Sequence, residues 1–111
     1  MSIRTRRDGS TCTVALAGEL DLANAEAFAD ELERAEPGRA APHEIVVDMT
    51  ELEFIDSAGI AILVAAHHRL NADGGRFKLV RSQATAVCRI LALTGLTSRS
   101  PSWIPSLADG T

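Results

Sequence analysis

Apolar and polar residues alternate along the first part of the chain. In the segment 11–18, TCTVALAG, every second residue is a larger apolar one, which is the period of a half-buried β-strand. The dipeptide Asp8-Gly9 stands before this segment, and such a pair suits the tight turn of a β-hairpin. A first strand near residues 3–6 should therefore run antiparallel to the strand that follows.

The spacing of apolar residues then lengthens to three or four. In the segment 21–38, DLANAEAFADELERAEPG, acidic residues separate the apolar positions and Pro37-Gly38 ends the pattern. The apolar positions are Leu22, Ala25, Phe28, Ala29 and Leu32. This pattern predicts an amphipathic helix with these side chains on its buried face. Asp21 and Asn24 can each cap the first turn with a side-chain oxygen, and the sequence leaves the choice open.

The rest of the chain alternates between strand and helix patterns. A run of apolar and β-branched residues at 43–50, HEIVVDMT, predicts a central strand covered on both faces and followed by a turn. Helix patterns follow at 57–70 and at 84–96, the second with Gly95 as its C-cap, and a strand pattern at 74–81 lies between them. The order ββαβαβα predicts an α/β fold, with helices joining parallel strands by right-handed crossovers and with the hairpin as an antiparallel edge.

The composition is that of a globular chain with one domain. The 111 residues are 46% apolar and 23% charged, enough for a core without disulfides or metals. We expect a domain at 1–96 and a short, loosely ordered tail at 97–111, which is rich in Ser and Pro. Cys12 and Cys88 lie in apolar segments, which favours reduced and buried thiols over a disulfide.

Charge and motifs argue against several classes of function. The net charge of −4 disfavours binding to nucleic acid. No segment resembles a secretory signal or an apolar span of about 18 residues, so we expect a cytoplasmic protein without membrane contact. His67 and His68 are adjacent on a predicted helix and point about 100° apart, so they do not form a metal-binding pair. A glycine-rich nucleotide loop is also missing, and we expect neither cofactor nor metal.

The segment EFIDSAGIAI, residues 53–62, places Ser57 where a helix pattern begins after a strand. In open α/β sheets such a position is favoured for a ligand or a reactive group. Small residues at Ala58 and Gly59 would leave the hydroxyl open to another protein's active site. Alternatively, Ser57 or Asp56 is only an N-cap and Gly59 only a packing residue. A nucleophilic serine needs a base and an oxyanion site, and since no motif supplies them we do not expect a hydrolase.

Three motifs in this order, GELDLANAEAF, EIVVDMTELEFIDSAGIAIL and LTGL, resemble those of STAS domains, specifically the bacterial anti-sigma factor antagonists. The resemblance runs from about residue 3 to Leu96. It implies a STAS-type α/β fold, with a mixed sheet of four to five strands, an antiparallel edge hairpin and three to four helices. By this resemblance Ser57 is phosphorylated by a partner that is both anti-sigma factor and serine kinase, and a serine phosphatase removes the phosphate. The unphosphorylated form binds the anti-sigma factor and releases the sigma factor, so we expect a binding module and not an enzyme.

The same resemblance indicates which surface faces the partner. The implied partner-binding residues are Asp21, Asp56, Ser57, Ala58, Gly59 and Ile60. Many members of the family have a second hydroxyl after the phosphoacceptor, whereas this chain has Ala58, so Ser57 is the only hydroxyl in the motif. STAS domains also serve as accessory subunits of lipid transporters or as parts of stress-sensing complexes, which is the alternative function. A transporter accessory would not need a free serine at position 57.

Overall fold

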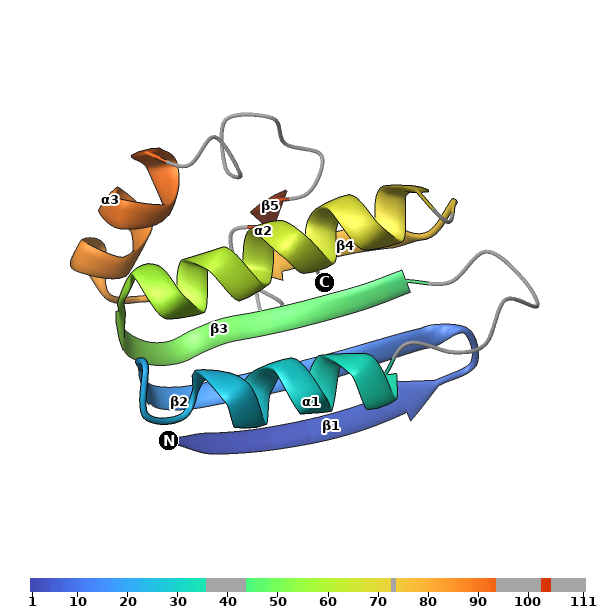
Figure 1. Ribbon diagram of the computed structural model, residues 1–111, viewed down its shortest axis with the longest axis horizontal. Coiled ribbons are helices and arrows are strands. Elements are labelled where there is room, and N and C mark those ends of the chain that lie inside the picture. The colour runs from blue at the N-terminus through green and yellow to red at the C-terminus, as the bar shows by residue number, and fades with distance from the viewer. Residues whose placement is uncertain (36–43, 73, 94–102, 105–111) are drawn as a thin grey trace.

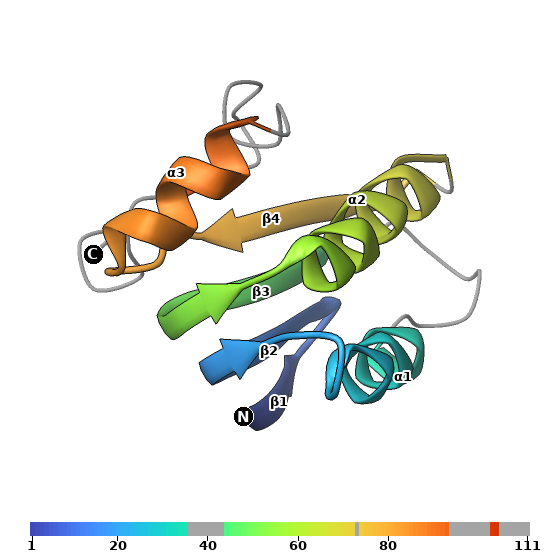
Figure 2. The ribbon, with the colours of Figure 1, turned by 60° about the vertical axis from the view of Figure 1, so that its left-hand side comes forward.

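A five-stranded β-sheet forms the centre of the molecule (Figures 1 and 2). The computed structural model describes residues 1–35, 44–72, 74–93 and 103–104. The elements along the chain are β1 (Ser2–Asp8), β2 (Thr11–Leu20), α1 (Ala25–Ala35), β3 (Glu44–Ile55), α2 (Ser57–Ala72), β4 (Arg76–Val80), α3 (Thr85–Leu93) and β5 (Trp103–Ile104). The expected C-cap, Gly95, lies outside the described residues.

The sheet is mixed, as predicted. Its strands lie in the order β1-β2-β3-β4-β5, and β1 runs antiparallel to β2 while the other neighbours pair in parallel. The predicted order ββαβαβα is therefore confirmed. Strand β5 pairs with the end of β4, so the sheet extends into the segment 97–111 that we expected to be a tail.

The β1–β2 hairpin forms where the sequence predicts it. Asp8 pairs with Thr11, so Gly9 and Ser10 make a two-residue connection. The φ angle of Gly9 is +64°, a conformation that glycine adopts freely and that side chains disfavour. The central pair of the turn therefore begins at Gly9, one residue later than the dipeptide that predicted it.

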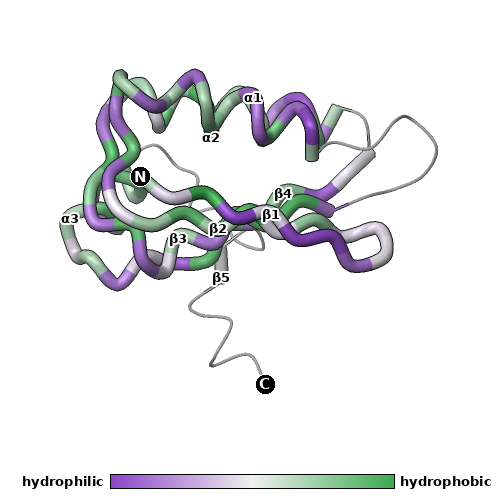
Figure 3. Tube along the Cα trace, turned by 90° about the horizontal axis from the view of Figure 1, so that it is seen from below, coloured by the Kyte–Doolittle hydropathy of each residue, from purple (hydrophilic) through white to green (hydrophobic). Residues whose placement is uncertain are grey.

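Helices α1 and α2 lie over one face of the sheet, and α3 lies outside that layer (Figure 3). The pattern of β2 is confirmed, because Cys12, Val14 and Leu16 are buried and the residues between them are partly exposed. The buried side chains that α1 and α2 contribute to the core are Phe28, Leu32, Ala35, Leu63, Ala66 and Leu70. None of the described helices combines the length and apolar character needed to cross a lipid bilayer.

Helix α1 begins later than the apolar spacing predicts. Its first residue is Ala25, and Leu22 lies in the preceding connection with 78% of its surface exposed. The prediction that Leu22 lies on the buried face of this helix is wrong. The side chains of Asp21 and Asn24 bond to the backbone of the connection, and short polar side chains of this kind compete with helical hydrogen bonds.

Strand β3 continues to Ile55, so the prediction of a turn directly after HEIVVDMT is wrong. The first half of β3 is buried on both faces, as predicted for a central strand. The pairing of β3 with β2 is irregular at two places, and at each of them β3 has one residue more than β2. The first lies between the partners of Ala15 and Ala17, and the second between the partners of Gly18 and Glu19. Bulges of this kind bend a strand and break its alternation. From Met49 to the end of β3 the buried residues are Met49, Leu52 and Ile55, which are three apart.

Polar side chains tie α1 to the edge strand β1. Glu31 accepts hydrogen bonds from Arg34 and from Thr5 Oγ1, the latter at 2.6 Å. The bond from Arg34, followed by that from Thr5, lowers the pKa of Glu31 below its ordinary value. Arg7 Nη2 donates to the carbonyl of Ala35 at 3.0 Å, at the helix end where carbonyls lack partners within the helix.

A buried hydroxyl holds the connection between β4 and α3. Ser82 Oγ donates to the carbonyl of Leu52 at 2.7 Å and accepts from the N–H of Ala84 at 2.9 Å. Cys88 Sγ donates to the Ser82 carbonyl at 3.2 Å. Both cysteines are free thiols, and burial raises the pKa of Cys12, so that this thiol stays protonated at neutral pH.

Candidate functional site

The carboxyl ends of β2, β3 and β4 lie at the same end of the sheet, because these strands are parallel. By "this edge" we mean this end of the sheet and not the edge strand β1. At this edge, on the left in Figure 1, the β2–α1 connection meets the junction of β3 with α2. The N–H of Asp56 donates to the carbonyl of Leu20 at 3.1 Å, which joins the ends of β2 and β3. Ligands of open α/β sheets bind outside the carboxyl ends of the strands, so this edge is the candidate site.

Asp56 is the N-cap of α2. Its Oδ1 accepts from the N–H groups of Ala58 at 3.0 Å and Gly59 at 3.2 Å, and its carbonyl accepts from the N–H of Ile60 at 3.0 Å. A carboxylate at this position satisfies N–H groups that the helix leaves free and lies at the positive end of the helix dipole. The sequence left the cap open between Asp56 and Ser57, and the structure assigns it to Asp56, with Ser57 as the first helical residue.

The second carboxylate oxygen of Asp56 binds the neighbouring connection. Oδ2 accepts from the N–H of Leu22 at 3.1 Å. Within that connection, Asp21 Oδ1 accepts from the N–H of Ala23 at 3.0 Å, and Asn24 Oδ1 accepts from the N–H of Asp21 at 2.9 Å. The carbonyl of Asn24 accepts the first bond of α1, so Asn24 has the N-cap position while its side chain turns back into the connection. Two hydrogen bonds, from the N–H of Asp56 to Leu20 and from the N–H of Leu22 to Asp56 Oδ2, thus bring the segments of Asp21 and Asp56 together.

Ser57 is exposed at the start of α2, and Ala58 and Ile60 beside it are half-buried. Among the described histidines, His67 and His68 lie ten and eleven residues further along the same helix. At 1.5 Å per residue this is a distance of about 15 Å. Neither ring reaches the hydroxyl to serve as a general base. The arrangement suits a hydroxyl that receives a group from another protein's active site better than one that attacks a substrate.

Gly59 is buried, and close packing explains why no side chain stands there. A Cβ at this position would lie 2.7 Å from Leu20 Cγ, 2.8 Å from Leu20 Cδ2 and 2.9 Å from Ile55 Cγ1. Carbon atoms settle at about 3.5–4.0 Å from one another. The interpretation of Gly59 as a packing residue is therefore confirmed. Its absent side chain lets α2 approach the ends of β2 and β3.

Two large apolar side chains close to Asp56 are exposed, and the sequence patterns did not reveal them. Leu22 is 78% exposed and Phe54 is 46% exposed. Phe54 lies two residues before Asp56, whose carboxylate binds the backbone of Leu22. The signal for Leu22 was ambiguous, since an apolar residue between Asp21 and Asn24 fits the first turn of a helix as well as an exposed turn.

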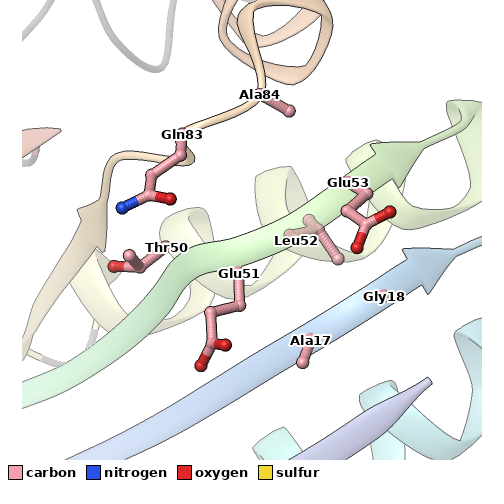
Figure 4. A pocket seen from close by; sticks show the side chains of 8 residues that line it. All are labelled: Ala17, Gly18, Thr50, Glu51, Leu52, Glu53, Gln83 and Ala84. Carbon is pink, nitrogen blue, oxygen red and sulfur yellow. The ribbon is translucent and has the colours of Figure 1, made fainter.

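A shallow hollow of about 260 Å³ lies beside the candidate site, with α2 on the far side of β3 (Figure 4). It is lined by Ala17, Gly18, Thr50, Glu51, Leu52, Glu53, Gln83 and Ala84. The lining contains two carboxylates but no serine, cysteine, histidine, lysine or arginine. The Thr50 hydroxyl already donates to Asp48 Oδ1 at 2.6 Å. The hollow therefore offers no serine or cysteine nucleophile and no cation to bind a developing negative charge, and the exposed Ser57 is the better candidate for a reacting group.

A mixed sheet with an antiparallel edge hairpin, two helices on one face and a capped helix at the end of β3 defines the class of protein. A family model described as Mlab, STAS domain, matches residues 3–104. The chain belongs to the STAS domain family.

Among curated proteins, the chain is similar to the anti-sigma-F factor antagonist RsfA of Mycobacterium tuberculosis. The two are 32% identical over 78 residues, which is 70% of this chain and 60% of the relative. The chain therefore spans less than two thirds of the length of the curated relatives that it matches.

Solved structures support the same fold. The crystal structure of an anti-sigma factor antagonist from Mycobacterium paratuberculosis has a TM-score of 0.79 at 27% identity, over 97% of this chain and 88% of that one. Bacillus SpoIIAA in its phosphorylated form has a TM-score of 0.75 at 21% identity, over 98% of this chain and 96% of that one, which is a likeness of fold. The expected STAS-type fold is confirmed.

Proposed function

We propose that this chain is an anti-sigma factor antagonist that is switched off by phosphorylation of Ser57. In its unphosphorylated form it binds an anti-sigma factor and thereby releases the sigma factor. The observation that carries this proposal is the exposed hydroxyl of Ser57 at the first position of α2, next to an aspartate that already caps the helix. The hydroxyl is free for modification because the fold does not need it as a cap. The identity of 32% to a protein named as an anti-sigma-F factor antagonist supports the same function.

The proposed contact surface consists of residues around this hydroxyl. Its exposed or half-exposed members are Asp21, Asp56, Ser57, Ala58 and Ile60. Gly59 contributes from beneath, because its close packing on Leu20 sets the position of the first turn. The partner is an anti-sigma factor that is also a serine kinase, and a serine phosphatase reverses the modification.

Charge explains how one phosphate could end binding. A phosphate on Ser57 adds about −1.5 to −2 charges at neutral pH. The N–H groups of Ala58 and Gly59 are already bonded to Asp56 Oδ1, so much of the new charge would face the partner. Unfavourable charge in an interface costs several kcal/mol, and about 2.7 kcal/mol is a hundredfold change in affinity. A loss of about a hundredfold or more therefore needs no refolding.

In this proposal the chain is a substrate and a binding module, not an enzyme. Protein kinases hold ATP and magnesium with a glycine-rich loop, a lysine and dedicated carboxylates. The sequence has no glycine-rich nucleotide loop, so we assign the chemistry to the partner.

Intact-mass analysis tests the phosphoacceptor. Wild type, Ser57→Ala and Thr85→Ala are incubated with ATP, magnesium and purified candidate anti-sigma kinases encoded in the same genome. Thr85 is the matched control, because it is also an exposed hydroxyl residue at the first position of a helix. We expect one phosphate on the wild type and on Thr85→Ala, and none on Ser57→Ala. Phosphate on Ser57→Ala would overturn the assignment.

Calorimetry on the unmodified and phosphorylated wild type then measures the switch. We expect the phosphorylated form to bind the same kinase at least about a hundredfold more weakly. Equal affinity of the two forms would contradict the proposed switch. A wild type that no kinase modifies, but that binds a membrane-transport ATPase, would instead indicate an accessory subunit.

A further inference from the structure

Exposed apolar side chains gather beside the phosphoacceptor. Among the described residues, the large apolar side chains with substantial exposure are Met1 at 42%, Leu22 at 78%, Phe54 at 46% and Leu93 at 86%. Leu22 and Phe54 lie next to Asp56 and Ser57, whereas Met1 lies at the same end of the sheet but against Gly18 of β2. The N–H of Leu22 donates to Asp56 Oδ2 at 3.1 Å, and Phe54 lies two residues before Asp56 on β3.

Leu22 stands on a connection that hydrogen bonds hold in place. Asp21 Oδ1 accepts from the N–H of Ala23 at 3.0 Å, and the side chain of Asn24 bonds both to the N–H of Asp21 and to the carbonyl of Glu19. Because the backbone is already ordered, covering Leu22 costs the rotamer entropy of its side chain but little backbone entropy. An apolar side chain contributes most to binding when the partner buries it in a well-packed pocket without water.

The charge of the same edge indicates the chemistry of the partner's surface. The chain has no lysine or arginine in the segments 8–33 and 44–68, which contain the β2–α1 connection and the β3–α2 junction. Carboxylates are frequent in both segments, and Glu19 and Glu53 are exposed beside Leu22 and Phe54. Complementary interfaces place opposite charges around an apolar centre. A partner for this edge should therefore combine an apolar pocket with a basic rim.

We propose that Leu22 and Phe54 are the apolar anchors through which this chain docks on its anti-sigma factor, and that the anti-sigma factor receives them in an apolar pocket bordered by lysine or arginine. This inference rests on the proposed function and adds the source of binding energy to it. Ser57 and its phosphate decide whether docking occurs, and the two apolar side chains provide the affinity.

The test measures affinity for the kinase that phosphorylates Ser57 in the mass experiment. Wild type, Leu22→Ala, Phe54→Ala and Leu93→Ala are compared by calorimetry in the unphosphorylated state. Leu93 is the matched control, because it is an equally exposed leucine and ends α3, a helix that contributes no residue to the proposed contact surface. We expect Leu22→Ala and Phe54→Ala each to bind about tenfold or more weakly, and Leu93→Ala to bind within about twofold of the wild type. Raising the salt concentration should weaken binding of the wild type, because basic and acidic rims attract less strongly when screened.

Thermal unfolding of the same variants separates docking from folding. Leu22→Ala should unfold at the temperature of the wild type, because Leu22 is 78% exposed, and Phe54→Ala at a somewhat lower temperature, because about half of Phe54 is buried. Both variants should be fully folded at the temperature of the binding assay. If Leu22→Ala and Phe54→Ala bind like the wild type, or if Leu93→Ala loses as much affinity as they do, the inference is wrong while the proposed function stands. If no anti-sigma kinase binds or modifies the wild type, the proposed function fails and this inference fails with it.

Discussion

Replacing Gly59 by alanine should destabilise the fold, although alanine is the better helix former. The added methyl would lie 2.7 Å from Leu20 Cγ and 2.9 Å from Ile55 Cγ1. These distances are about 1 Å shorter than the separation at which carbon atoms attract each other. Leu20 and Ile55 are 0% and 1% exposed, so neither side chain can turn into solvent to make room. The helix start would have to move away from the sheet instead.

The size of the effect is the difference between two opposing contributions. Inserting a methyl into a packed core costs about 1–3 kcal/mol. Alanine recovers at most about 1 kcal/mol relative to glycine in a helix interior, and less in the first turn, where the backbone is only partly helical. We therefore expect Gly59→Ala to lose about 1–2 kcal/mol of unfolding free energy. In a domain of this size the unfolding temperature would fall by at least about 4 °C.

A double-mutant cycle on Gly59 and Leu20 identifies the cause. Urea unfolding gives the stability of the wild type, Gly59→Ala, Leu20→Ala and the double variant. Leu20→Ala alone should cost about 2–5 kcal/mol. In the double variant the new methyl occupies part of the space that Leu20 leaves, so its loss should be smaller than the sum of the single losses. Additive losses, or a Gly59→Ala variant as stable as the wild type, would refute the steric argument.

Three further predictions concern polar contacts. Ser82→Ala should lower the unfolding free energy by about 1–3 kcal/mol in urea, because the buried carbonyl of Leu52 loses its donor; unchanged stability would contradict this. Asp56→Ala should lower the unfolding free energy by about 0.5–2 kcal/mol, and Asp56→Asn by less, because the amide oxygen of asparagine can still cap α2. The backbone amide resonance of Leu22 should shift in both variants, because its N–H bonds to Asp56. Equal losses of stability in the two variants would argue against the cap. Glu31→Gln should be less stable than the wild type at pH 7. A carboxyl whose pKa is lower in the folded state than in the unfolded state stabilises the fold at pH values above its pKa in the unfolded state. The difference between the two proteins should therefore vanish as the pH falls below 4.5 and through the lowered pKa of Glu31. A difference that stays constant from pH 7 to about pH 3 would contradict it.

Local patterns predicted those parts of the fold that local chemistry decides. The alternation in TCTVALAG and the glycine after Asp8 predicted the hairpin, because a strand face and a two-residue turn depend on neighbouring residues. The second half of β3 escaped prediction. Its bulges against β2 place Met49, Leu52 and Ile55 three residues apart on the buried side, a spacing that matches neither a regular strand nor a turn.

In the candidate site, too, the sequence predicted the features that neighbouring residues determine and missed those that depend on residues far apart in the chain. The motif around Ser57 indicated the junction of a strand with a helix, and this junction is present. The cap could not be assigned, because Asp56 and Ser57 both carry suitable oxygens. Leu22 was placed on the wrong surface, since its conformation depends on the side chains of Asp21 and Asn24 beside it and also on Asp56, 34 residues later in the chain. Contacts between residues so far apart leave no periodic pattern in the sequence.

Asp56 connects the two parts of the proposed docking edge. One of its oxygens holds the first turn of α2, the other holds the backbone of Leu22, and Ser57 follows it directly. A phosphate on Ser57 would therefore act on the carboxylate that positions both the helix start and the proposed anchor. The core beneath this edge depends on other contacts, above all the packing of Gly59 on Leu20 and Ile55. The proposed switch can thus change binding at the surface while the unfolding free energy, which the core dominates, stays nearly constant.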